Sequence, residues 1–341
     1  MKRLADIPLS VLDLSPIVEG GSIADSFRNS ADLARHVESL GYRRFWLAEH
    51  HNIPGIASAA TAVLIGHIAA ATSTIRVGSG GIMLPNHAPL VIAEQFGTLE
   101  ALFPGRIDLG LGRAPGTDQV TSRALRRDPA AADDFPDQVQ ELIGLLGTVR
   151  SGQRIKAIPG ANSKVPVWLL GSSTFSARLA AFLGLPFAFA AHFAPRLLHE
   201  ALQTYRDHFQ PSAAWPRPHA MVGIPVIAAD TDDEARYLST SVQQMILNLI
   251  RHAPTPVPPP VLTMDGRWSA AEKAAVHDHL GAAIIGGPET VKEKLEAFVA
   301  STGADELIIH SGFHRHEDRR RSYEIVAEAA AATAGLSARS G

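Results

Sequence analysis

Cysteine is missing from this chain of 341 residues. Its absence excludes disulfide bonds, thiolate zinc sites and cysteine nucleophiles. A large excess of positive or negative residues is missing too, because the chain has 31 basic and 34 acidic residues and a net charge of −3. This balance gives no electrostatic basis for binding nucleic acid or an anionic membrane.

Long apolar runs are also missing from the chain. No stretch approaches the roughly 20 apolar residues that a helix needs to cross a bilayer. The N-terminal segment carries basic residues, but Asp6, Pro8 and Asp13 interrupt its apolar run, which is a poor match to a secretory signal peptide. Apolar residues still make up 46% of the chain, enough to bury a large core. Because neither a membrane span nor a signal peptide is indicated, we expect a cytoplasmic protein.

Short apolar runs alternate with helical patterns along most of the chain. The eight expected strands span residues 7–14, 43–48, 75–80, 106–111, 165–170, 186–191, 220–228 and 305–310. Strands that alternate with helices predict a parallel sheet, and eight such units predict an α/β protein with a (β/α)8 TIM barrel as a single domain over residues 1–341. A doubly wound sheet is the alternative. Both folds bind ligands at the carboxyl ends of their strands.

Residues 251–280 interrupt this alternation before the last unit. The stretch 251–268 is rich in proline and has little periodicity, and it is too long for a simple connector. We expect it to be a mobile lid, followed by a helix at 269–279. Residues 335–341 are expected to form a frayed tail.

The second expected strand ends in Glu49-His50-His51. Adjacent strand residues point to opposite faces, so only one of the two histidines can face the barrel mouth. A histidine there would suit a general acid or base, whereas the alternative is a loop histidine beside a packed glutamate. A metal site is not expected, because the histidines lack helical spacing and no second ligand cluster stands out.

Glycines cluster at the ends of the third and fourth strands. Residues 77–81 read VGSGG, and residues 110–116 read GLGRAPG. Glycine permits close approach of a flat ligand, although a tight bend is the simpler interpretation of 77–81. The second cluster is not a dinucleotide fingerprint, because its spacing is GxGxxxG, Pro115 intrudes and no helix begins at once.

Residues 171–174 read GSST, between an expected strand and an expected helix. Hydroxyl groups and free backbone N–H groups at a helix start can hold a phosphate, although an ordinary helix cap explains the same residues. Arg113, at the end of the fourth strand, could supply charge to that phosphate. The arginines at 123–127 and the run 314–321 are more simply explained as exposed helix faces.

Several longer motifs occur together in this chain. They are WLAEHHN, IRVGSGGIMLPNHAPL, FPGRIDLGLGRAPG, VWLLGSS and GLPFAFAAHFAP. Through them the chain resembles the bacterial luciferase-like flavin monooxygenase family, in the group 1 luciferase-like oxidoreductase branch, over nearly its whole length. The resemblance implies a TIM barrel that uses reduced FMN and O2 to oxidise a small organic substrate, aldehyde-like or other. It also implies a separate NAD(P)H:flavin reductase as the source of reduced FMN.

The resemblance assigns a role to individual residues. It implies that His50 is catalytic. Glu49 and His192, which follow expected strands, are candidates for the substrate pocket. The residues that it implies for cofactor binding are Ser79, Gly80, Gly81, Arg113, Gly171, Ser172, Ser173 and Ser176. It further implies a cis peptide bond between Gly80 and Gly81, and a homodimer. The apolar helices expected at 58–71 and 89–102 are the candidate contact surfaces of that dimer.

The chain departs from luciferase itself at two positions. Gly112 stands where luciferase has a reactive cysteine, and Gly171 stands where luciferase has a glutamate before its phosphate-binding serine. Thiol chemistry is therefore not expected, and light emission is not implied. Two other functions are compatible with the same residues: hydride transfer with a deazaflavin, and flavin binding without catalysis.

Overall fold

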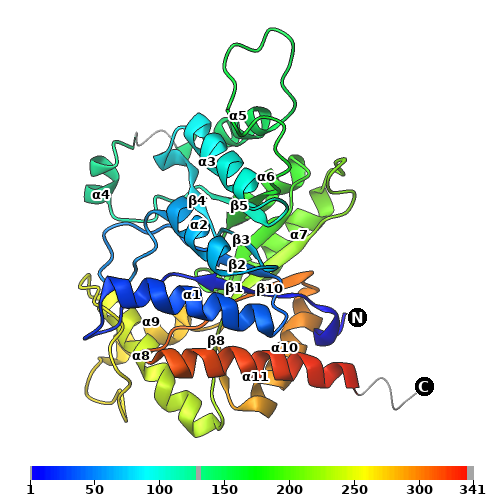
Figure 1. Ribbon diagram of the computed structural model, residues 1–341. Helices are drawn as coiled ribbons and strands as arrows, with labels where there is room; N and C mark the ends of the chain where they lie inside the picture. Colours follow the sequence, from blue (N-terminus) through cyan, green and yellow to red (C-terminus); the bar gives the residue numbers. More distant parts are fainter. Residues whose placement is uncertain (1, 128–131, 336–341) are drawn as a thin grey trace.

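Eight parallel strands close into a barrel in the computed structural model, which describes residues 2–127 and 132–335 (Figure 1). The barrel strands are β1 (Leu9–Asp13), β2 (Arg44–Leu47), β3 (Arg76–Ser79), β5 (Ile107–Gly112), β6 (Val167–Gly171), β7 (Phe187–Ala190), β8 (Ala220–Ala228) and β10 (Glu306–His310). They pair in this order, and β10 also pairs with β1, so that the sheet closes on itself. The predicted (β/α)8 TIM barrel is confirmed, and each predicted strand overlaps an observed one.

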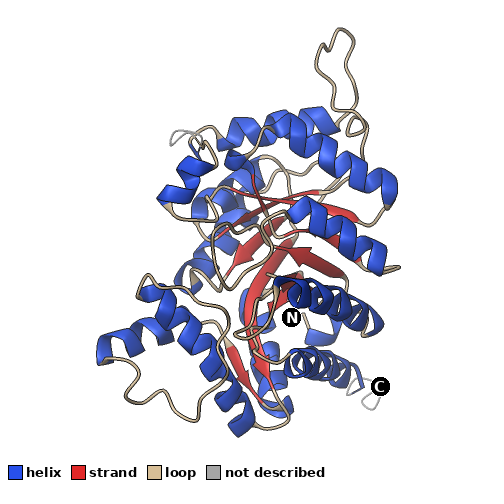
Figure 2. Cartoon of the chain, turned by 60° about the vertical axis from the view of Figure 1, so that its left-hand side comes forward, coloured by secondary structure: helices blue, strands red, loops and turns tan. Residues whose placement is uncertain are grey.

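Helices surround the strands, as Figure 2 shows. They are α1 (Ile23–Ser39), α2 (Thr61–Ala71), α3 (Pro89–Leu102), α4 (Gln119–Ala124), α5 (Phe135–Leu146), α6 (Thr174–Phe182), α7 (Leu198–His208), α8 (Asp232–Ile250), α9 (Ala270–His279), α10 (Pro288–Thr302) and α11 (His316–Gly335). The first and last helices, α1 and α11, pack side by side and complete the ring (Figure 1). Of the predicted tail, only Gly335 is described, as the last residue of α11, and the rest lies outside the described residues. None of the described helices is long and apolar enough to cross a membrane.

Several short elements were not predicted from the sequence, among them two strands and one helix. Strand β4 (Ile82–Met83) pairs with the end of β5, and β9 (Ile284–Gly286) pairs with the last residues of β8. Both are too short to show the alternation that identifies a strand. Helix α4 has only six residues, and the Asp118 carboxylate caps it by accepting from the N–H of Thr121 at 2.7 Å.

Buried ion pairs close the amino end of the barrel. The Arg44 guanidinium donates to the Asp108 carboxylate at 2.6 Å and to the Glu306 carboxylate at 2.9 Å, and all three side chains are buried. Above this layer, toward the carboxyl ends of the strands, lie the indole rings of Trp46 and Trp168, also fully buried. These two filled layers form the barrel floor, and a cavity lies at the carboxyl ends of the strands.

The predicted lid lies against neighbouring elements in this structure. The backbone of Val257 exchanges two hydrogen bonds with the loop after β1, to Ile17 at 2.8 Å and from Glu19 at 2.9 Å. The Thr240 hydroxyl on α8 accepts from the N–H of Val261 at 2.8 Å. These bonds define one docked position of the segment, and its mobility stays a prediction.

Candidate functional site

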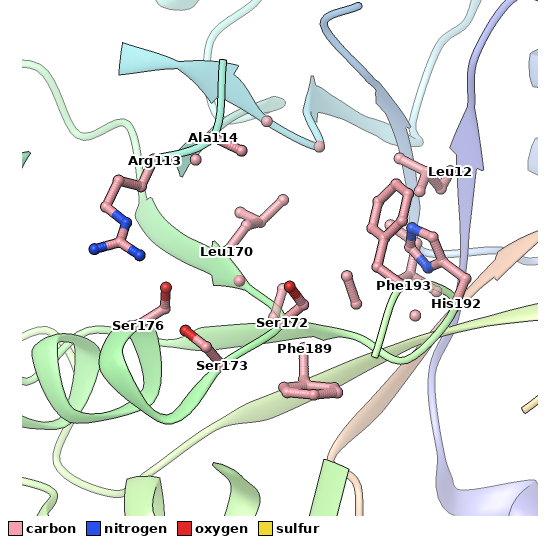
Figure 3. A pocket seen from close by; sticks show the side chains of 18 of the residues that line it. Leu12, Arg113, Ala114, Leu170, Ser172, Ser173, Ser176, Phe189, His192 and Phe193 are labelled. Carbon is pink, nitrogen blue, oxygen red and sulfur yellow. The ribbon is translucent and has the colours of Figure 1, made fainter. Parts of the chain in front are cut away.

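A cavity of about 230 Å³ opens at the carboxyl ends of the strands. One end of it is polar and carries Arg113, Ser172, Ser173 and Ser176. The other end is formed mainly by apolar side chains and by one imidazole, and its residues are Leu12, Trp46, Ala188, Phe189, His192, Phe193 and Ile308. Figure 3 shows the arginine and serine side chains on one side and Leu12, His192 and Phe193 on the other. The cavity can therefore hold an elongated ligand with one anionic end.

Gly80 and Gly81 form a wall of the cavity where no side chain could fit. A Cβ on Gly80 would lie 2.7 Å from Leu12 Cδ1, and one on Gly81 would lie 2.8 Å from the Gly110 carbonyl oxygen. The peptide bond between the two glycines is cis, as the resemblance implies. Ser79, predicted to bind the cofactor, does not line the cavity, because its hydroxyl exchanges hydrogen bonds with the Gly110 backbone at 2.8 and 2.9 Å.

The polar end combines a guanidinium group with the start of a helix. The Arg113 guanidinium lies 4.2 Å from the centre of the Phe175 ring, which holds it in place beside α6. Ser173 is the N-cap of α6, but its side chain makes no capping hydrogen bond. Within the described residues, the hydroxyls of Ser172, Ser173 and Ser176 have no hydrogen-bond partner. Such donors at a helix start suit a phosphate group.

Two residues support this polar end from behind. A Cβ on Gly171 would lie 2.3 Å from the Ser176 hydroxyl oxygen, so glycine is what allows Ser176 to approach the strand. The half-buried Arg127 guanidinium donates to the Arg113 carbonyl at 2.9 Å and to the Asn86 amide oxygen at 3.1 Å. The interpretation of Arg127 as an exposed helix residue is therefore wrong, because it supports the backbone of Arg113.

The Glu49 carboxylate lies behind the cavity wall rather than in it. It accepts hydrogen bonds from the His51 and His87 imidazoles, both at 2.9 Å, and from the N–H of Met83 at 3.0 Å. Burial by itself raises the pKa of Glu49, but the hydrogen bonds from His51 and His87 outweigh it and lower the pKa to about 2. Glu49 therefore stabilises the loop after the two glycines, a different role from the substrate contact predicted for it.

His50 comes three residues after the last residue of β2. Its N–H donates to the Ser58 carbonyl at 3.1 Å, and its side chain is half-buried at the end of β2. Burial lowers the pKa of the imidazole, and an interaction with the backbone of Gly116 partly opposes that shift. His50 does not line the cavity itself, but it lies near enough to His192 and His310 for its charge to lower their pKa values.

A family model described as luciferase-like monooxygenase matches residues 9–306. The chain belongs to the luciferase-like monooxygenase family. An uncharacterized protein of Bacillus subtilis, YvbT, is 60% identical over 326 residues, which cover 95% of this chain and 96% of YvbT. A luciferase-like monooxygenase of Escherichia coli K12 is 51% identical over 320 residues, covering 94% of this chain and 96% of the relative.

Several solved structures have the same fold as this chain. Apo-MsnO8 superposes with a TM-score of 0.85 at 37% identity, covering 95% of this chain and 98% of its own. More distant structures include the FMN complex of a 3,6-diketocamphane monooxygenase constituent from Pseudomonas putida, with a TM-score of 0.71 at 18% identity, over 96% and 98% of the two chains. An F420-dependent secondary alcohol dehydrogenase reaches 0.69 at 14% identity, over 95% and 99%. These two show the fold alone.

Two half-buried imidazoles distinguish the apolar end of the cavity in this luciferase-like monooxygenase. His192, predicted as a substrate-pocket residue, lines the cavity, and its ring centre lies 6.5 Å from that of His310 at the end of β10. Burial, reinforced by His310, lowers the pKa of His192 to about 3; burial, reinforced by Arg319, lowers that of His310 to about 4. Both imidazoles are therefore neutral near pH 7. Sequence analysis did not select His310, although its position at the end of the last strand was the available signal.

One further expectation about α11 is wrong. The run 314–321 was expected to form an exposed face, but Arg319 is 2% exposed. Its guanidinium donates to the Asp13 carboxylate at 2.7 Å and to the Ser311 carbonyl at 3.1 Å. The cause is the closure of the barrel, which brings α11 over the end of β1 and buries this turn of the helix.

Proposed function

We propose that this luciferase-like monooxygenase uses reduced FMN and O2 to oxidise a small organic substrate. The observation that carries the proposal is the polar end of the cavity, where one guanidinium and three hydroxyls without other partners among the described residues face the same space. Beside it, Gly80 and Gly81 line the cavity with backbone atoms alone, a surface against which a flat ring system could lie. Reduced FMN, when bound, would supply the electrons that activate O2.

The chain itself would bind, orient and shield the reactants. Arg113, Ser172 and Ser176 would hold the phosphate, and the glycine wall would fix the plane of the ring. The apolar end would take the substrate and exclude water, which protects reactive species formed in the site. His50 would hold or move a proton at this end of the barrel. The segment 251–280 would act as the lid that closes the site.

Two other functions use the same groups. A deazaflavin cofactor would serve hydride transfer, and flavin binding without oxidation would make the chain a carrier. Titration of the protein with FMN, riboflavin and F420, followed by visible absorbance, separates the cofactors. We expect FMN to bind most tightly, because riboflavin lacks the phosphate. Tighter binding of F420 would contradict the proposal, and tight FMN binding with no O2-dependent substrate oxidation would support the carrier.

We further propose that the chain forms a homodimer and receives reduced FMN from a separate NAD(P)H:flavin reductase. Apolar side chains on α2 and α3 remain exposed, among them Val63 (72%) and Leu102 (64%). Such faces are commonly covered across a two-fold axis. Light scattering at micromolar concentration tests the dimer, and a particle of 36.3 kDa, the mass of one chain, would contradict it.

A further inference from the structure

Three of the four tryptophans form a continuous row through the barrel. The ring centres of Trp46 and Trp168 lie 5.2 Å apart at an interplanar angle of 81°, and those of Trp168 and Trp215 lie 5.7 Å apart at 70°. These are edge-to-face contacts between neighbouring rings. Electron transfer falls off steeply with distance, and indole is one of the side chains that lose an electron most easily. Rings in contact are therefore suited to pass an electron in short steps.

The two ends of the row lie in different environments. Trp46 is fully buried from the protein surface but lines the floor of the cavity. Trp215 lies in the turn between α7 and β8, at the amino ends of the strands, and its side chain is partly exposed. The row therefore connects the cavity to the face of the barrel opposite its mouth. Core packing accounts for Trp46 and Trp168, but it does not require a third indole that reaches solvent.

The surroundings of the three rings differ in a way that suits a relay. The Trp46 Nε1–H donates to the Asp108 carboxylate at 3.1 Å, which stabilises positive charge on that indole. Trp168 has the Arg44 guanidinium 4.9 Å from its ring centre, and its Nε1 has no partner within the described residues. Positive charge is therefore less stable on Trp168 than on Trp46 or on Trp215, which water can solvate. Trp168 would pass charge on rather than retain it.

We propose that Trp46, Trp168 and Trp215 conduct single electrons between the cavity and the opposite face of the barrel. A one-electron oxidant in the cavity, such as an oxygen-centred radical or a photoexcited flavin, takes an electron from Trp46 and is reduced. Trp168 then donates an electron to the oxidised Trp46, and Trp215 donates one to the oxidised Trp168. A reductant in solution, such as ascorbate, returns an electron to Trp215 and is oxidised by one electron. No covalent bond forms or breaks along the row, and the path does not depend on FMN being the cofactor.

The path can be tested on the cofactor-free protein by oxidising it from outside. Photoexcited ruthenium tris-bipyridine with persulfate oxidises accessible tryptophans, and peptide mass spectrometry locates the oxidised side chains. The complex is too bulky for the cavity and cannot reach the buried Trp46 directly. We expect oxidation at both Trp215 and Trp46 in the wild type. In Trp168→Phe, oxidation at Trp46 should fall to the level of an unilluminated sample while Trp215 is still oxidised.

Two further variants control this experiment. Trp215→Phe should also abolish oxidation at Trp46, which guards against a local folding defect in Trp168→Phe. Trp268 is half-buried and packs on His277, apart from the row. Trp268→Phe should therefore leave Trp46 oxidation unchanged, and Trp268 serves as the internal reference in the other proteins. Trp46 oxidation that is equal in all variants, or that is absent from the wild type while Trp215 is oxidised, would overturn the proposal.

Discussion

The polar side chains of the barrel floor are paired with one another, whereas hydroxyls at the polar end of the cavity have no partner among the described residues. On the floor, Arg44 forms ion pairs with Asp108 and Glu306, and all three are buried. At the polar end of the cavity, the hydroxyls of Ser172 and Ser176 have no hydrogen-bond partner within the described chain. Buried charge is tolerated only when it is paired, whereas unused donors around a cavity have a role once a ligand arrives. The difference separates groups that stabilise this fold from groups kept for binding.

The largest expected effect comes from His50, which belongs to neither region and lies near His192 and His310. His50→Ala should slow the reoxidation of bound reduced FMN coupled to substrate oxidation by about 10²–10⁴-fold, since proton transfer by a positioned side chain contributes that much. FMN affinity should change far less. Stopped-flow absorbance measures the rate, and His199→Ala, at an exposed position of α7, is the matched control. Equal rates in His50→Ala and wild type would make His50 structural.

Removing the ion pairs of the barrel floor should instead lower the free energy of unfolding. Arg44→Met leaves the buried Asp108 and Glu306 carboxylates without a shared partner, which we expect to cost about 3–5 kcal/mol in the free energy of unfolding. Arg35→Met is the control, because its exposed guanidinium lies 4.0 Å from the Asp32 carboxylate and such pairs contribute about 0–1 kcal/mol. Urea unfolding measures both. Similar losses in the two variants would contradict the assigned role of the floor.

Glu49 should make stability depend on pH in the acid range. Its folded pKa of about 2 lies below the ordinary value of 4.5, so it stabilises the protein fully above about pH 5. This contribution, on the order of 3 kcal/mol, should be lost as the pH falls from 5 towards 2. Glu49→Gln should lower stability at pH 7 and flatten the acid part of the curve. Unfolding curves with the same pH dependence in both proteins would exclude this role.

A substitution at the polar end of the cavity should change FMN affinity and not the free energy of unfolding. Arg113→Ala should weaken FMN binding by about 2–4 kcal/mol, because one or two charged hydrogen bonds to the phosphate are lost. Riboflavin affinity should stay nearly constant, since riboflavin carries no phosphate. Arg123→Ala on α4 is the control, because that side chain is exposed and does not line the cavity. A parallel loss of FMN and riboflavin affinity would mean that Arg113 acts on the fold instead.

The sequence predicted the barrel and most of the cavity because both follow from local patterns. Alternating strands and helices define the fold, and glycine or serine after a strand indicates where a ligand can approach. These signals located Gly80, Gly81, Arg113 and Ser172, all of which line the cavity. The local pattern does not reveal which side chains barrel closure will bury.

The features that the sequence analysis missed depend on long-range contacts. Arg319 is buried because α11 packs over β1, and Glu49 is turned from the cavity by His87, which comes 38 residues later. Arg127 lies in an arginine-rich stretch typical of an exposed face, yet it supports Arg113. In each case a charged residue binds a partner that its neighbours in the sequence do not indicate. Propensity and spacing carry no information about such partners.

The most direct test of the account is a crystal structure of this protein soaked with FMN. We expect the phosphate within hydrogen-bonding distance of Arg113, Ser172 and Ser176, and the ring system against Gly80 and Gly81. The side of the ring facing Leu12 and His192 should remain open for a substrate. A phosphate bound elsewhere, or a ring that does not contact the two glycines, would contradict the assignment of the cavity as the FMN site.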